Sequence, residues 1–207
     1  MRNPFLVLVS LTIVAAPAAA QVAVDVGPLI GYYRPFGRFA PASIMSTDMP
    51  TQPSDLSGRL WGAEAHVTVH GRFGVDALGA TATSTLPSCL CPEGPTGETH
   101  ARVNLAVVEG QYDLSLAPGR YHLWLGAGPS IVQHAGTGYA RYGSPTSVAG
   151  GLSLHFAAPL GSHVQLAASA MGLRYSFNLD FPPEHGPQLD GLASVGLRWH
   201  WAEGSVP

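Results

Sequence analysis

The sequence contains no lysine and few charged residues of any kind. Charged residues make up 11% of the 207 residues, whereas roughly 25% is typical of a soluble domain. The ten basic residues are all arginine, they form no cluster, and the formal net charge is −3. A nucleic-acid-binding protein usually carries a basic patch, so the sequence predicts no nucleic-acid partner. Sparse charge together with 46% hydrophobic residues favours a chain that contacts lipid.

Long hydrophobic runs are also scarce, and the one that exists lies at the N-terminus. A single positive charge precedes an apolar stretch, and Ala18, Ala19 and Ala20 then provide small residues before Gln21. This order is typical of a cleavable secretory signal peptide, which we predict as residues 1–20. The stretch is shorter than the roughly 20 apolar residues that a spanning helix needs. No later apolar run reaches that length, so the pattern excludes helical membrane spans.

Eight segments of the remaining chain alternate apolar and polar residues, which is the pattern of a β-strand with two different faces. Each is long enough for a tilted strand that crosses a bilayer, which takes about 9–11 residues. Two segments change phase, so we predict a β-bulge near Val107 and Val108 and a second slip near Gly172. The segments are 22–36, 58–70, 72–83, 100–116, 120–134, 147–158, 163–178 and 188–201.

The connections between these segments alternate between short and long. Bacterial outer-membrane barrels have short periplasmic turns and longer external loops. The same order here predicts that both termini lie in the periplasm. The short connections are Gly71, 117–119 and 159–162, and the long ones are 37–57, 84–99, 135–146 and 179–187.

Aromatic residues on the apolar faces are predicted to gather at two levels. Aromatic girdles flank the aliphatic band of a membrane barrel at its two interfaces. The level near the short connections comprises Phe73, Tyr112, Tyr121, Phe156, Trp199 and Trp201, and the level near the long ones comprises Tyr32, Trp61, Tyr175 and Phe177.

These patterns predict an all-β fold, an eight-stranded antiparallel up-and-down transmembrane β-barrel in residues 21–207 with a short C-terminal tail. Over residues 21–201 the chain resembles the eight-stranded outer-membrane barrels of the OmpA/OmpX type. The sharpest match is the last segment, in which Gly196, Trp199 and Trp201 resemble the C-terminal insertion signal of such proteins. The resemblance implies a monomer in the bacterial outer membrane that contacts outer-membrane lipid and lipopolysaccharide. It also implies recognition by the barrel-assembly machinery during insertion.

The polar faces of the segments supply candidates for the barrel lumen. One interpretation of their histidines is a metal site or an acid–base group. The interpretation that we favour is a packed polar plug, because side chains fill an eight-stranded barrel and buried polar groups need partners. No metal-ligand spacing or nucleophile motif is present, so we predict no catalytic residue, cofactor or metal. The predicted network comprises Asp25, Glu64, His66, Asp76, Arg102, His122, His155 and Arg198.

Two further details of the barrel are predicted from residue positions. Asp25 and Arg198 lie at similar depths in the first and last segments, so we expect them to be neighbours across the seam. Cys89 and Cys91 lie in the second long connection. In an oxidising compartment they could form a disulfide, although so small a ring is tight. A free thiol pair and a metal site are the alternatives.

We consider three functions for a secreted chain with eight alternating segments. The favoured one is an integral outer-membrane β-barrel protein without enzymatic activity, with a structural or surface-interaction role through its external loops. The alternative is an outer-membrane lipid-modifying enzyme of the lipid A deacylase or palmitoyl transferase type. Such enzymes carry a histidine with a serine or an acid near the lipid, whereas the strand histidines here are predicted to face inward. The third, a soluble secreted barrel of the lipocalin type, would need a more highly charged exterior.

Overall fold

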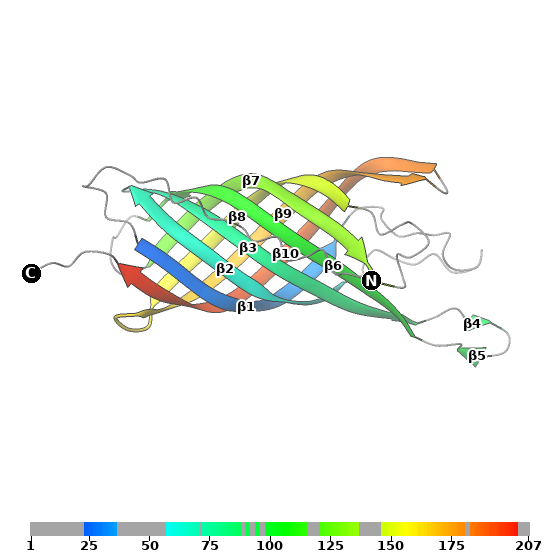
Figure 1. The fold of residues 1–207 in the computed structure, drawn as a ribbon, viewed down its shortest axis with the longest axis horizontal. Helices are drawn as coiled ribbons and strands as arrows, with labels where there is room; N and C mark the ends of the chain where they lie inside the picture. The colour runs from blue at the N-terminus through cyan, green and yellow to red at the C-terminus, as the bar shows by residue number, and fades with distance from the viewer. Residues whose placement is uncertain are drawn as a thin grey trace, which may run out of the picture.

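The computed structural model closes eight antiparallel strands into one barrel (Figure 1). Each barrel strand pairs with its neighbour in the chain, and β1 pairs with β10 to complete the ring. The predicted fold class is therefore confirmed. The strands are β1 (Ala23–Pro35), β2 (Gly58–His70), β3 (Phe73–Pro87), β6 (Glu98–Asp113), β7 (His122–Ala135), β8 (Thr146–Pro159), β9 (Val164–Asp180) and β10 (Pro183–Ala202), with a small separate pair of strands, β4 (Leu90–Cys91) and β5 (Gly94–Pro95).

The described part of the chain leaves out both termini and several connections. The predicted signal peptide, 1–20, the final residues of the predicted tail and Cys89 lie outside it. Within the described ranges, no helix is long and apolar enough to cross a membrane. The structure describes residues 23–36, 57–70, 72–87, 90–91, 94–95, 98–115, 121–136, 146–180 and 183–202.

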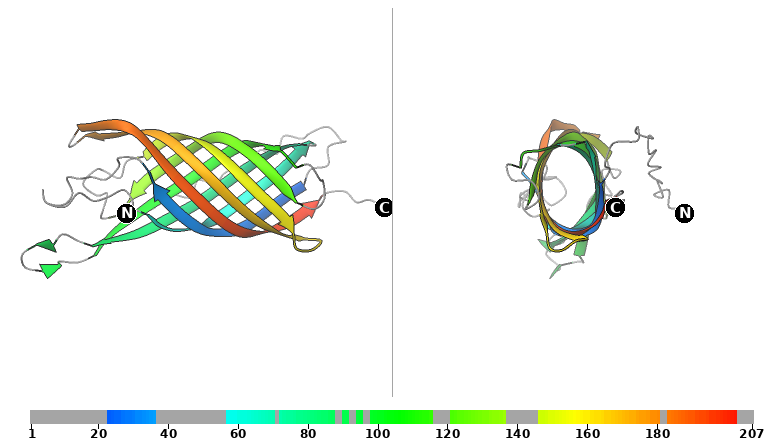
Figure 2. Two further views of the ribbon diagram at one scale, coloured as in Figure 1. Left: turned by 180° about the vertical axis from the view of Figure 1, so that it is seen from behind. Right: turned by 90° about the vertical axis from the view of Figure 1, so that its left-hand side faces the viewer.

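The two ends of the barrel differ. β1 begins and β10 ends at the same end, which we call the inner end, and β4 and β5 lie beyond the opposite, outer end (Figure 1). Viewed along its axis, the barrel is a closed ring (Figure 2). Because every barrel strand has a partner on both sides, the ring has no free sheet edge. The outer connections are 36–57, 88–97, 136–145 and 181–182, and the inner ones are 71–72, 114–121 and 160–163.

The last outer connection is shorter than predicted. β9 continues to Asp180 and β10 starts at Pro183, so most of the predicted loop 179–187 is strand. The β9–β10 hairpin extends past the rest of the barrel at the outer end (Figure 2).

Side chains alternate between the lumen and the outside along each strand. In β1, Asp25, Leu29 and Tyr33 are buried, whereas Val26 and Ile30 are exposed. The outward side chains form an apolar band with aromatic residues towards both ends, as predicted. The exposed aromatic residues are Phe73, Tyr112, Tyr121, Phe156, Trp199 and Trp201 towards the inner end and Tyr32, Phe36 and Trp61 towards the outer end.

The predicted β-bulge at Val107 and Val108 is wrong. β6 pairs with β3 in one unbroken register, from Tyr112 opposite Phe73 to Glu98 opposite Pro87. Val107 therefore points into the lumen and Val108 points out. The physical reason is that the outer part of the lumen is itself apolar. In the outer half of β6 the apolar side chains of Val103, Leu105 and Val107 line the lumen and Arg102 lies outside, so the polarity of the two faces is the reverse of that in the inner half.

Because β6 keeps its register, two side chains that were predicted to face the lumen face outward instead. Arg102, predicted to lie in the lumen, is exposed on the outward face. His100 is also exposed on that face, so the prediction that every strand histidine faces inward is wrong.

The predicted slip near Gly172 is also wrong. β9 pairs with β10 in a continuous register that passes through Gly172 opposite Gly191. Tyr175 is therefore buried in the lumen rather than part of the outer aromatic level. The side chain of Phe177 lies outside the described part of the structure.

Candidate functional site: the filled lumen

The inner part of the lumen holds five carboxylates, and each of them has a basic partner. We call this set the inner polar layer. Apart from two partly exposed histidines near the inner mouth, its side chains are buried. The pairs are Asp25 with His200, Glu64 with Arg198, Asp76 with His66, Glu109 with His155, and Asp113 with His122.

Arg198 lies at the centre of this layer and is 2% exposed. Its Nε and Nη2 atoms donate to the two carboxylate oxygens of Glu64, each at 2.8 Å. Nη2 also donates to Oδ1 of Asp76 at 3.4 Å. The planar guanidinium matches a carboxylate in this two-bond geometry, which makes such a bond strong and directional. Arg198 thus links β10 to β2 and β3 across the lumen.

The predicted pairing of Asp25 with Arg198 needs correction. Both side chains face the lumen, and β1 pairs with β10 as expected. The strand register, however, places Asp25 opposite His200, and Nδ1 of His200 bonds to Oδ1 of Asp25 at 2.6 Å. Equal depth along two strands did not identify the partner, because the long arginine side chain reaches Glu64 instead.

Glu109 accepts hydrogen bonds from three residues, two in β8 and one in its own strand, β6. Nε2 of His155 donates to its Oε1 atom at 2.5 Å, and the Ser153 hydroxyl lies 2.7 Å from either carboxylate oxygen. Nε2 of Gln111 donates to Oε1 at 3.0 Å. Gly126 makes room for this group, since a Cβ atom at that position would lie 2.8 Å from the carboxyl carbon of Glu109.

The other two pairs lie towards the turns at the inner end. His66 faces Asp76 across the β2–β3 hairpin, as predicted, with 3.7 Å between Nδ1 and Oδ1. The ring of Trp124 packs against His66, with 4.7 Å between centroids. Nδ1 of His122 bonds to Oδ2 of Asp113 at 2.7 Å, and the His122 side chain is 37% exposed at the inner mouth.

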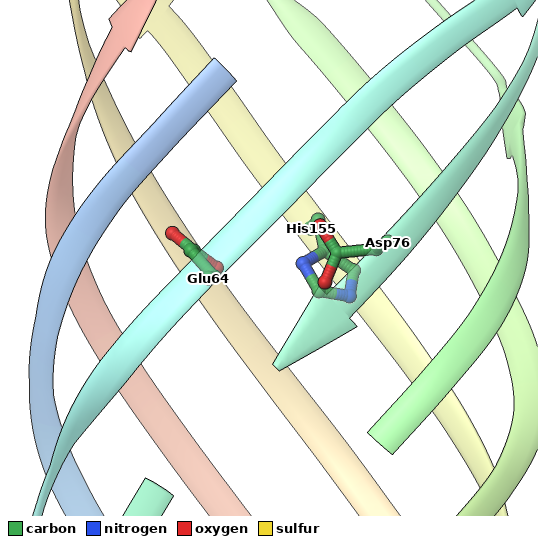
Figure 3. Close-up of side chains that lie close together, drawn as sticks. All are labelled: Glu64, Asp76 and His155. Carbon is green, nitrogen blue, oxygen red and sulfur yellow. The ribbon is translucent and has the colours of Figure 1, made fainter. Parts of the chain in front are cut away.

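Three of these side chains could in principle offer ligand atoms to a metal ion. Glu64, Asp76 and His155 project into the lumen from β2, β3 and β8 (Figure 3), and one ligand atom from each lies within 4.8 Å of the others. Each is already engaged, because Arg198 bonds to both carboxylates and His155 bonds to Glu109. The positive charge between the carboxylates is thus supplied by the guanidinium, so the arrangement favours a polar plug.

The residues predicted for the network and those found in the layer overlap without being identical. Arg102 is not part of it. Glu109, Asp113 and His200 belong to it although they are not among the predicted site residues. Their alternation already places them on the polar faces, so position along the strand was the available signal. The structure places the other predicted members, Asp25, Glu64, His66, Asp76, His122, His155 and Arg198, in the layer.

Between the inner polar layer and the outer end, the lumen is filled by apolar side chains. We call this set the apolar layer. Its residues are almost inaccessible to solvent; Val132 and Leu173, for example, are 0% exposed. Sequence reasoning missed this layer, because it assigned apolar residues to the outside. The layer includes Leu29, Leu60, Leu78, Leu105, Val107, Val132, Met171, Leu173 and Leu192.

Near the outer end, Asp190 forms the centre of a third group. It is 0% exposed. The hydroxyls of Tyr33 and Tyr175 donate to its Oδ2 atom, each at 2.7 Å, and Nε2 of Gln188 donates to Oδ1 at 2.7 Å. Tyr33, Tyr175 and Gln188 are neutral donors, whereas the carboxylates of the inner polar layer bond to basic groups.

The predicted insertion signal and the predicted disulfide both stay predictions, although the structure places the residues of the signal. Trp199 and Trp201 are exposed on the outward face of β10. Gly196 packs closely against β1, since a Cβ atom there would lie 2.5 Å from the carbonyl oxygen of Pro28. A role of these residues in insertion stays a prediction. The same holds for the disulfide, because Cys89 lies outside the described residues.

Comparison with known proteins supports the fold. No protein-family model and no curated protein matches the sequence. Among solved structures, Neisserial surface protein A is similar with a TM-score of 0.54 and 13% identity, over 88% of this chain and 99% of that one. The outer membrane protein OprG from Pseudomonas aeruginosa is similar with a TM-score of 0.55 and 11% identity, over 88% and 97%. The chain has the fold of the small eight-stranded outer-membrane barrels.

Proposed function

We propose that the protein is an integral outer-membrane β-barrel without enzymatic activity. It holds its outer connections at the cell surface and keeps its own lumen closed. The observation that carries this proposal is the filling of the lumen by two successive layers of buried side chains, one polar and one apolar.

The exterior supports a place in a membrane. Its apolar band would be costly to expose to water but fits the hydrocarbon core of a bilayer, and the aromatic residues at both levels fit the two interfaces. Two of the similar solved proteins are described as a surface protein and an outer membrane protein. With this orientation, the inner end faces the periplasm with both termini, and the outer connections face outward.

Closure of the lumen predicts that the protein is not a porin. In the inner polar layer, Arg198, Glu64 and Asp76 meet near the axis. In the apolar layer, the side chains of Leu173 and Val132 are 0% exposed. A continuous water path would have to pass both layers.

Planar-bilayer recording tests the closed lumen. The folded protein, verified by its heat-modifiable gel migration, is added to a bilayer beside a porin of known conductance as the positive control. We expect no steady single-channel opening from this protein. A stable conductance at concentrations at which the porin inserts would overturn the proposal. Recovery in the inner-membrane or soluble fraction of cells would overturn the proposed location.

The lipid-modifying alternative has one point of support. Among the strand histidines whose side chains the structure describes, only His100 faces outward. Incubation of the protein with lipopolysaccharide, followed by mass analysis of lipid A, tests this alternative. We expect no gain or loss of an acyl chain. A change in acylation that disappears in His100→Ala would show that the protein is an enzyme.

A further inference from the structure

The charges of the barrel are sorted by sign between the lumen and the outside. All six acidic side chains that the structure describes are buried: Asp25, Glu64, Asp76, Glu109, Asp113 and Asp190. The described arginines are all exposed with the exception of Arg198, which is buried. Four of these lie towards the outer end, and we call them the arginine collar: Arg34, Arg59, Arg102 and Arg174.

The strand register places the collar beside the outer aromatic level. Arg59 pairs with Tyr32 across β1 and β2. Arg34 lies two residues beyond Tyr32 on the same face, and its guanidinium stacks over the ring of Phe36 at 5.4 Å. Arg174 pairs with Leu189, whose carbonyl accepts a hydrogen bond from the backbone of Phe36. The collar therefore lies where the headgroups of the outer leaflet would meet the barrel.

An apolar groove of about 430 Å³ opens on the outside of the barrel at this level, across β9, β10 and β1. Its floor consists of residues with small or absent side chains, and one wall is built by Tyr32, Arg34 and Phe36. A Cβ atom added to Gly172 would meet nothing within 4 Å, so the groove is open there, whereas the ring of Phe36 lies against Gly191, where an added Cβ atom would press on it. The floor residues are Ala170, Gly172, Gly191 and Ala193.

We propose that this groove binds one acyl chain of lipopolysaccharide and that Arg34 binds a phosphate of the same lipid A headgroup. The inference rests on the proposed place of the barrel in the outer membrane. A hydrocarbon chain matches the apolar floor, and a groove lets it contact the barrel on more than one side, which increases its van der Waals contacts. The guanidinium forms charge-assisted hydrogen bonds with phosphate.

Charge complementarity selects an anionic lipid. Every charged side chain that the structure describes on the outward face near the groove is an arginine. Arg174 lies two residues beyond Gly172 on the same strand face and can contribute a second positive charge to a bisphosphorylated headgroup. A zwitterionic phospholipid has acyl chains but no net negative charge, and a free phosphate ion has no acyl chain.

Native mass spectrometry of the protein purified in detergent tests the site. The probes are bisphosphorylated lipid A, the same lipid A after removal of its phosphates, and inorganic phosphate as a competitor. Arg34→Gln removes the charge in the groove, and Gly172→Leu fills the floor. Their matched controls are Arg102→Gln, in the collar but away from the groove, and Gly79→Leu, at an outward glycine of β3 where a Cβ atom also meets nothing within 4 Å.

We expect one tightly bound lipid A per protein. Arg34→Gln should weaken binding by about tenfold, the order that corresponds to one charge-assisted hydrogen bond. Gly172→Leu should weaken it severalfold, whereas both controls should bind like the original protein. Dephosphorylated lipid A should bind at least as weakly as lipid A binds to Arg34→Gln, because it also loses the contact with Arg174, and inorganic phosphate should not displace lipid A.

The proposal is overturned if both controls lose as much affinity as the groove variants, if dephosphorylated lipid A binds equally well, or if inorganic phosphate alone displaces lipid A. The measurement is made in detergent, so it does not depend on conductance or on cell fractionation. A failure of the lipid site is therefore distinguishable from a failure of the proposed function.

Discussion

The inner and outer parts of the lumen are filled in different ways. The inner part matches each carboxylate with a basic group, and Arg198 bonds to two carboxylates at once. The outer part packs aliphatic side chains such as Leu29 and Leu173, and Asp190, the one buried carboxylate among the side chains described there, bonds to neutral donors. The stability of a buried charge depends on the oppositely charged groups beside it, whereas the stability gained from aliphatic side chains depends on how closely they pack. The two parts should therefore respond differently to substitution.

The largest effect is expected at Arg198. Arg198→Met leaves Glu64 and Asp76 buried without their guanidinium, and removing one member of a buried ion pair costs about 3–5 kcal/mol of unfolding free energy. Urea unfolding in lipid vesicles, followed by tryptophan fluorescence, measures this loss. The double variant Glu64→Gln with Arg198→Met should recover part of the stability. A single variant as stable as the original protein would show that the pair is not structural.

A smaller loss is expected from a cavity in the apolar layer. Leu173 is 0% exposed, and Leu→Ala substitutions in well-packed interiors cost on the order of 3 kcal/mol. Leu173→Ala should lower the urea midpoint accordingly, measured in the same vesicles. Leu152→Ala is the matched control, because Leu152 is 66% exposed on the outside. An equal loss in both variants would contradict close packing inside the barrel.

Gly126 tests how tightly the inner polar layer is packed. A Cβ atom in Gly126→Ala would press on the carboxyl group of Glu109, and such overpacking costs about 1–3 kcal/mol. Gly110→Ala in β6 is the control, since a Cβ atom there meets nothing within 4 Å. The control should unfold at the original urea concentration or slightly above it. If both alanine variants behave alike, the space around Glu109 is larger than the structure indicates.

The smallest effect is expected at Asp190. Asp190→Asn keeps an oxygen acceptor for the tyrosine hydroxyls and removes a charge that has neutral donors around it. We expect a loss of about 1 kcal/mol, the order of one hydrogen bond. Glu64→Gln, in which Arg198 loses its charged partner, should cost clearly more in the same urea experiment. The reverse order would contradict the contrast between the two parts of the lumen.

Alternation was a reliable guide where the polar face of a strand is the one that lines the lumen. In β10, Arg198 and His200 face inward and Trp199 and Trp201 face outward, as the sequence predicts. The same reasoning failed for Arg102, because its strand neighbours Val103 and Leu105 are apolar and lie inside. A period of two identifies the faces but does not say which one meets lipid.

Eight strands and the polar character of the inner part of the lumen could be predicted from the sequence, because both follow from local patterns of neighbouring residues. The last outer connection could not, since most of its predicted residues extend β9 and β10. That Arg198 bonds to Glu64 rather than Asp25, and that Leu60, Leu105 and Leu173 fill the barrel, is known from the folded structure alone. These outcomes depend on strand register and on side-chain reach across a closed ring. They join residues far apart in the chain, which no local pattern encodes.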